Sequence, residues 1–493
     1  MTNLHTPWEP NAVDVASWEG LGRDLARGKY VLTSLWGGRG HVSMALLDPV
    51  SGKSSVAHLP VPDGTFPSIA KHYLPALRLE RSITDMCGFT PVGCPDPRPW
   101  QDHGVWGVKA PLTDNKPHTD PPPPYTFLPV EGEGLHQIPV GPIHAGIIEP
   151  GHFRFTANGE TVVRLEERLG YMHRGAEKLF EGQDISGGAK IAARLSGDST
   201  VAYSLAYARA VEAAWSLDVP QRAHFLRALF AEIERIANHL GDIGAICNDA
   251  AFSVMLAHCG ILREETLRLA FECFGHRLMM DRIVPGGVKV DLTRDSAEKI
   301  LAWAQKTEKH FEILVDLYDN TASLRDRTDT TGTVSAELVT LYGAGGHVGR
   351  ASGRQFDSRK NTPYPPYDRL DFEIPLRNTG DVNARVWIRI CEIRQSLSLI
   401  RQILNHIPEG GIAFSLPESP PAETQEGAAL VEAFRGDVFI WLRITDGKIE
   451  RCHPRDPSWF QWPLLENAIK GNIVADFPLC NKSFNCSYAG QDL

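Results

Sequence analysis

The sequence predicts an α+β protein, in which a small α+β domain precedes a large and mainly helical domain with strands at its periphery. Residues 29–60 alternate apolar and polar side chains as strands do. Residues 111–126 are rich in proline, which stiffens a chain and favours a linker. Several long segments after residue 200 repeat apolar residues at three- and four-residue spacing, which is typical of helices. The 493 residues are enough for at least two domains.

The small domain is predicted to cover residues 1–110. Its strand region contains a Gly-Gly-Arg-Gly turn at 37–40, and helical spacing follows at 68–79. Residues 111–127 are predicted to form the proline-rich linker to the second domain.

The large domain is predicted to cover residues 128–493. Short strands are expected at 136–140, 153–157 and 161–168, and a strand pair is expected around the turn at Gly436 and Asp437. Helices are expected between them, at 201–215, 221–246, 262–274, 297–318 and 382–406.

Composition excludes several classes of function. The net charge of -10 and the lack of a long basic cluster argue against a nucleic acid partner. Since no apolar run approaches the roughly 20 residues of a membrane span and no leader pattern is seen at the start, we expect a cytoplasmic chain. The nine cysteines include no CxxC pair. This favours a reducing compartment and argues against an iron–sulfur cluster held by this chain alone.

Two motifs carry a resemblance to known families. Residues 141–155 (GPIHAGIIEPGHFRF) and 169–179 (LGYMHRGAEKL) resemble the opening signatures of the quinone-site (49 kDa) subunit of respiratory complex I and of formate hydrogenlyase-type NiFe hydrogenase large subunits. Residues 79–89 and 93–99 resemble the 30 kDa subunit of complex I. A fusion of these two parts is typical of hydrogenase-4 and formate hydrogenlyase large subunits, and the resemblance implies that architecture here.

The resemblance also locates the positions where the hydrogenases hold nickel and iron. Those relatives use four thiolates, from an RxCGxC motif and a terminal DPCxxC motif. In this chain the four positions are Ser196, Ser199, Ser487 and Gly490. Hydroxyls and a glycine cannot replace thiolates at a soft-metal site, so a NiFe centre and hydrogenase activity are not expected.

In complex I the same region binds a quinone, and the resemblance implies an acceptor pocket built from His144, His152, Gly197 and Asp198. His152 aligns with the histidine that contacts the quinone. The position of the second contact, a tyrosine, falls at or near Gly197. As an alternative interpretation, Ser196, Asp198 and Ser199 simply cap the helix that follows them.

Three further residues receive roles from the resemblance. Glu149 matches a proton-relay glutamate, although it could equally pair with Arg154 or with a backbone turn. Arg174 and His173 are expected beside the 4Fe–4S cluster of a partner, where a cation raises the reduction potential of the cluster. The alternative for Arg174 is a bridge to Glu177 or to a carbonyl.

Together these features imply an oxidoreductase subunit of a membrane-bound complex that resembles complex I or hydrogenase-4. The expected partners are an iron–sulfur small subunit like the 20 kDa subunit of complex I, a ferredoxin-like subunit and antiporter-like membrane subunits. The chain would lie peripherally on the cytoplasmic side of the cell membrane, with a quinone as one candidate acceptor. In the alternative function, the chain is a structural or coupling subunit without redox chemistry.

Overall fold

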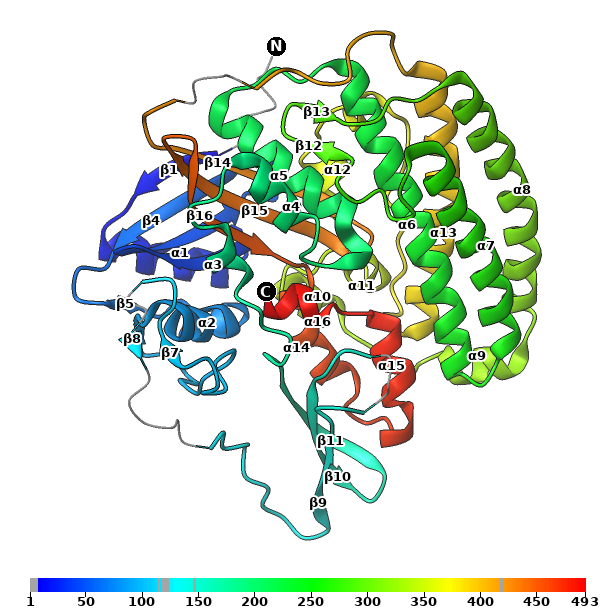
Figure 1. Cartoon of the computed structure of the whole chain (residues 1–493). Helices are drawn as coiled ribbons and strands as arrows, with labels where there is room; N and C mark the ends of the chain where they lie inside the picture. Colours follow the sequence, from blue (N-terminus) through cyan, green and yellow to red (C-terminus); the bar gives the residue numbers. More distant parts are fainter. Residues whose placement is uncertain (1–7, 114–115, 118–123, 145–147, 417–420) are drawn as a thin grey trace.

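The computed structural model describes residues 8–113, 116–117, 124–144, 148–416 and 421–493. It confirms the α+β class. Figure 1 shows the N-terminal sheet on one side of the molecule and a bundle of long helices on the other, with the C-terminal helices between them. Parts of the predicted linker (114–115 and 118–123) and of the first motif (145–147) lie outside the described residues.

The N-terminal part is built on a four-stranded sheet in the order β1-β4-β3-β2. Strands β2 and β3 form the expected hairpin around Arg39 and Gly40, and β1 adds in parallel to β4. The elements of this part are β1 (Trp8–Ala12), α1 (Val15–Ala26), β2 (Val31–Gly38), β3 (His41–Leu47), β4 (Ser54–Pro60), β5 (Thr65–Pro67), η1 (Leu74–Ala76), α2 (Leu77–Cys87), β6 (Thr90–Val92), β7 (Val108–Lys109) and β8 (Lys116–Pro117).

The predicted position of the helix at 68–79 is wrong, because α2 begins only at Leu77. The carboxylate of Glu80 accepts hydrogen bonds from the backbone amides of Ile69 (2.5 Å) and Ala70 (3.1 Å) and from the Ser68 hydroxyl (2.6 Å). These bonds hold residues 68–70 in a loop against α2, since a buried carboxylate needs several donors.

Helices dominate the second part, as expected. The long helices α6, α7, α8 and α13 lie side by side in Figure 1. Helix α7 begins nine residues earlier than predicted, and α13 has the predicted bounds. The helices of this part are α3 (Ala176–Phe180), α4 (Ile185–Ala192), η2 (Gly197–Ser199), α5 (Thr200–Trp215), α6 (Gln221–Asp249), α7 (Ser253–Phe274), α8 (Arg294–Asp319), α9 (Ala322–Thr328), α10 (Ala336–Leu341), α11 (Gly346–Ala351), α12 (Ser358–Asn361), η3 (Tyr367–Arg369) and α13 (Val382–His406).

Three small sheets and the C-terminal helices complete the fold. The strands are β9 (Leu135–Val140), β10 (His152–Asn158), β11 (Thr161–Arg168), β12 (Ile283–Val284), β13 (Gly287–Val288), β14 (Gln425–Ala433), β15 (Gly436–Thr445) and β16 (Lys448–Arg455). The last helices are α14 (Ser458–Ala468), η4 (Val474–Asp476), α15 (Phe477–Phe484) and α16 (Tyr488–Asp492). Among the described residues, no helix combines the length and the apolar character that a bilayer span requires.

The two predicted domains share hydrophobic cores. One cluster joins Trp18 of α1 to Phe153 of β10 and Trp462 of α14, and another places Trp36 of β2 against Phe439 and Trp441 of β15. Burial of such large aromatic side chains at a joint surface strongly favours one fixed arrangement. The predicted domain boundary at residue 110 stays a prediction. The parts of the chain before and after it pack against each other through these shared clusters.

Candidate functional site

The structure brings together the two motifs that would hold nickel in the hydrogenases. The hydroxyls of Ser196 and Ser487 lie 3.0 Å apart, although 291 residues separate them in sequence. Ser196 lies just before η2, and Ser487 caps α16 by accepting a hydrogen bond from the Gly490 amide (2.9 Å). Both serines are buried. Each of these buried hydroxyls therefore has the other as a hydrogen-bond partner.

An ion pair fills the space beside these serines. Arg435, in the turn between β14 and β15, donates to both carboxylate oxygens of Asp198, at 2.7 and 2.5 Å. It also donates to the Asn485 carbonyl (2.5 Å), and Asp198 accepts from the Ser196 hydroxyl (2.9 Å). Although desolvation opposes ionisation, the Arg435 guanidinium lowers the pKa of Asp198 to about 2. We call the four connected residues Ser196, Asp198, Arg435 and Ser487 the polar lock.

The fourth ligand position has no room for a cysteine. A Cβ atom placed on Gly490 would lie 2.5 Å from Oδ2 and 2.7 Å from Cγ of Asp456. Asp456 cannot easily withdraw, since it accepts hydrogen bonds from Tyr203 Oη (2.6 Å) and the Ser458 amide (2.9 Å). With three hydroxyls, one glycine and an ion pair in the site, the residues present do not fit a NiFe centre. Among the described residues, no cluster of histidine, cysteine and carboxylate side chains could hold a metal ion.

A pair of glycine substitutions tests this packing. Gly490→Ala should lower the free energy of unfolding by about 1–3 kcal/mol, because the new methyl group overlaps Asp456. Gly197→Ala should change it by less than about 0.5 kcal/mol, because a Cβ there meets no atom within 4 Å. Urea unfolding of both variants measures the difference, and equal stability of the two would contradict the crowding at Gly490.

The expectation that Asp198 and Ser199 cap the following helix is wrong. Neither side chain makes a capping hydrogen bond to α5. Glu234 of α6 takes this role and accepts from the amides of Val201 (2.7 Å) and Ala202 (3.2 Å). Burial raises the pKa of Glu234 to about 8. Asp198 is unavailable because Arg435 draws its carboxylate in another direction.

Glu149 lies at the same site and does not pair with Arg154. Its carboxylate accepts a hydrogen bond from the Ala489 amide of α16 at 3.0 Å, one residue from Gly490. Asp492 lies at the end of this helix and accepts from the Met172 amide (2.9 Å), while its Oδ1 atom has no partner among the described residues. Burial, with a contribution from Glu149, raises the pKa of Asp492 to about 7. Two carboxyl groups therefore flank the terminal motif.

The second motif is placed against the C-terminal residues. His173 Nδ1 lies 2.7 Å from the Asp492 carbonyl, and its ring stacks on Trp106 at 4.3 Å. Arg174 is exposed, and its guanidinium donates to the Leu195 carbonyl next to Ser196. The carbonyl alternative for Arg174 is thus observed, while Glu177 instead accepts from His453 and Arg451.

The two histidines of the first motif differ in their surroundings. His152 Nδ1 lies 3.2 Å from the Gly141 carbonyl, and its Nε2 accepts from Arg154 Nε at 3.2 Å. Both ring nitrogens are therefore occupied, and none of these partners belongs to the polar lock. His144 is half-buried, and its Nε2 has no partner among the described residues. Of the two, His144 is the one with a ring nitrogen that has no hydrogen-bond partner among the described residues.

The surface beside the polar lock is open at Gly197. This residue is exposed and has free space where a side chain would begin, and Asp198 is partly exposed next to it. A neighbouring cavity, lined by Asp198, Glu234 and Met279 among others, has a volume of only about 10 Å³. A cavity of this size holds about one water molecule.

The sequence did not point to Arg435 or Asp456 as residues of the site. Arg435 follows Phe434 in a short turn between two largely apolar strands, where nothing in the local sequence indicates its partner. Asp456 lies in the connection between β16 and α14. Each is buried and meets its partners only in the folded chain.

Comparisons with known proteins show which family the chain resembles. Residues 249–423 match the family model described as respiratory-chain NADH dehydrogenase, 49 kDa subunit. The chain is 31% identical over 440 residues to formate hydrogenlyase subunit 5 of Escherichia coli, and the match covers 87% of this chain and 77% of that protein.

Two further matches extend the comparison. An NADH-quinone oxidoreductase subunit of Carboxydothermus hydrogenoformans is 33% identical over 69% of this chain and 93% of its own length. A solved chain of the membrane-bound sulfane sulfur reductase, an archaeal respiratory membrane complex, superposes with a TM-score of 0.69 and 26% identity, over 74% of this chain and 100% of that chain. These matches confirm the resemblance that the motifs indicated.

Proposed function

This chain belongs to the family of the 49 kDa subunit of respiratory-chain NADH dehydrogenase, and from that premise we propose that it docks an iron–sulfur small subunit and receives an electron acceptor at the shared surface. It is a subunit of a membrane-bound complex of the complex I or hydrogenase type. The proposed partners also include a ferredoxin-like subunit and antiporter-like membrane subunits, with this chain peripheral on the cytoplasmic side.

The observation that carries the proposal is the polar lock next to an open surface. The lock replaces the ligands of an internal metal site, so the acceptor is not reduced at a NiFe centre in this chain. Gly197 and Asp198 form the exposed edge of the lock, and Arg174 donates to the neighbouring Leu195 carbonyl. An acceptor such as a quinone would therefore bind over Gly197, where electrons from the cluster of the partner can reach it.

The experiment uses the purified complex that contains this chain. Gly197→Phe should reduce electron transfer to a short-chain quinone by about tenfold or more, because a bulky ring displaces the acceptor. Gly197→Ala is the matched control and should keep turnover close to that of the wild type. Unchanged turnover in Gly197→Phe would contradict the site, and stoichiometric nickel in the same preparation would contradict the interpretation of the four ligand positions.

The charge of Arg174 gives a second test. Arg174→Gln should lower the midpoint potential of the neighbouring cluster by on the order of 50–100 mV, because a nearby cation favours the reduced and more negative cluster. Lys178→Gln, four residues further on, removes a charge that is paired with Glu181 at 2.7 Å and should have little effect. Redox titration followed by electron paramagnetic resonance measures both potentials. Equal midpoint potentials of the cluster in the wild type and in Arg174→Gln would show that the cluster does not lie next to Arg174.

A second candidate function is structural coupling without a redox role. The polar lock favours it, because hydrogen bonds of Arg435 and the two serines tie three distant segments together. The cavity beside Asp198 holds about one water molecule. Under this function, Gly197→Phe leaves electron transfer unchanged, whereas Arg435→Met disturbs assembly of the complex. Native gel analysis of the two variants separates the candidates.

A further inference from the structure

Two neighbouring cavities lie along β11, and no residue of the polar lock is among the residues that line them. The first has a volume of about 270 Å³ and lies where α2, β11 and α14 meet. The second has a volume of about 290 Å³ and is bordered by strands β9 to β11 and residues 129–131. Arg164 of β11 and Lys470, just after α14, line both cavities. These two cations therefore stand at the junction of the cavities.

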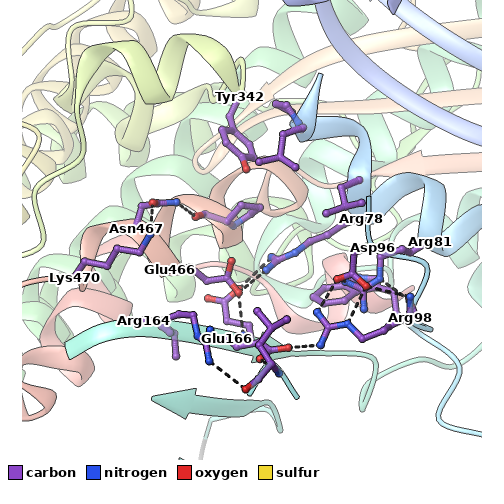
Figure 2. A pocket seen from close by; sticks show the side chains of 18 of the residues that line it. Arg78, Arg81, Asp96, Arg98, Arg164, Glu166, Tyr342, Glu466, Asn467 and Lys470 are labelled. Atoms are coloured by element: carbon purple, nitrogen blue, oxygen red, sulfur yellow. Dashed lines mark hydrogen bonds and ion pairs between the residues drawn. The ribbon is translucent and has the colours of Figure 1, made fainter. Parts of the chain in front are cut away.

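The other charges of the first cavity are already paired. Arg98 contacts Glu166 and Asp96 at 2.6 Å each, and Arg78 contacts Glu466 at 2.8 Å and Glu167 at 3.1 Å. Figure 2 shows Arg81, Asp96 and Arg98 together at one end of the cavity.

The two cations at the junction are not neutralised in this way. Arg164 and Lys470 lie at the other end of the cavity in Figure 2, and no carboxylate pairs with either within the described part of the chain. Lys470 donates a hydrogen bond to the Asn467 side chain at 2.9 Å. Neither cation at the junction therefore has a carboxylate of the described residues within ion-pair distance.

Unused hydrogen-bond donors lie at the same place. Arg164 donates hydrogen bonds from Nη2 to the carbonyls of Leu128 (3.1 Å) and Pro129 (3.0 Å), while its Nε is buried without a partner among the described residues. Thr156 of β10 lines the second cavity, is 4% exposed, and its hydroxyl likewise has no partner there. A buried donor without a partner is costly, and an oxyanion is the ligand that satisfies donors and cations together.

We propose that Arg164, Lys470 and Thr156 bind the carboxylate of a small organic acid whose apolar body lies in the first cavity. Leu77, Leu165 and other apolar residues line that cavity beside the paired charges. A monoanion is favoured over a dianion, because Glu131 and Glu166 also line the two cavities and repel additional negative charge. This site is separate from the polar lock and does not depend on the proposed function.

Titration calorimetry of the purified full chain with hexanoate, acetate and inorganic phosphate tests the proposal. Hexanoate should bind saturably and about tenfold or more tightly than acetate, because its additional methylene groups are removed from water. Phosphate should bind more weakly than hexanoate. Absence of saturable hexanoate binding would overturn the site, and phosphate affinity equal to that of hexanoate would overturn the assignment to an organic acid.

Three variants locate the binding. Arg164→Gln and Lys470→Gln should each lower the affinity for hexanoate by about tenfold, and Thr156→Val, which preserves the shape of the side chain, by about threefold. Lys448→Gln removes an exposed lysine on β16 and should leave affinity unchanged. If Arg164→Gln unfolds, the other two variants still decide. Full affinity in both Lys470→Gln and Thr156→Val would overturn the proposal.

Discussion

Glu392→Gln is expected to lower the free energy of unfolding by about 3–5 kcal/mol, because it removes one charge from a buried ionic network. Glu392 of α13 contacts Arg350 at 2.6 Å, Arg235 at 3.3 Å and His239 Nε2 at 2.8 Å. All four side chains are at most 1% exposed. With a neutral amide at this position, the buried guanidinium groups of Arg235 and Arg350 would lose the carboxylate of Glu392 as a partner.

A matched substitution on the surface separates this effect from the loss of any ion pair. Glu312 contacts Arg394 at 2.6 Å, but both side chains are more than 40% exposed. Glu312→Gln should cost no more than about 1 kcal/mol, because water screens the pair and solvates the remaining charge. Urea unfolding of both variants gives the comparison. Similar midpoints for the two would show that the buried network contributes no more than a surface pair.

Asp492→Asn is expected to stabilise the protein at pH 8 and to have little effect near pH 4. In the unfolded chain this carboxyl loses its proton near its ordinary pKa of 3.8, whereas burial raises its pKa in the folded chain to about 7. Between these values the folded state binds more protons, so stability falls as pH rises from about 4 to about 7. A shift of about three units corresponds to at most about 4 kcal/mol.

Asparagine removes this loss because it does not ionise, and its side-chain oxygen can still accept from the Met172 amide. The urea midpoint of Asp492→Asn should therefore exceed that of the wild type increasingly between pH 4 and pH 7. Asp446→Asn, at an exposed turn between β15 and β16, is the control and should give the same difference at every pH. Parallel curves for Asp492→Asn and the wild type would contradict the buried, protonated carboxyl.

The α+β class, the hairpin of β2 and β3 and the bounds of α13 could be predicted from the sequence, because hydrophobic periodicity is a local property of the chain. The four positions that correspond to the thiolate ligands of the hydrogenases could also be located in the sequence, since other residues of the two motifs can still be recognised. The helix at 68–79 was misplaced because Glu80 binds residues 68–70 from within α2, and local periodicity does not contain that contact.

What the sequence by itself determined is therefore the family and the absence of thiolates at Ser196, Ser199, Ser487 and Gly490. Only the tertiary structure decided what replaces them. Arg435 reaches Asp198 across 237 residues, and Glu234 rather than Asp198 caps α5. Such choices depend on which buried charges meet once the chain has folded, because a buried charge takes whichever partner lies within hydrogen-bond distance.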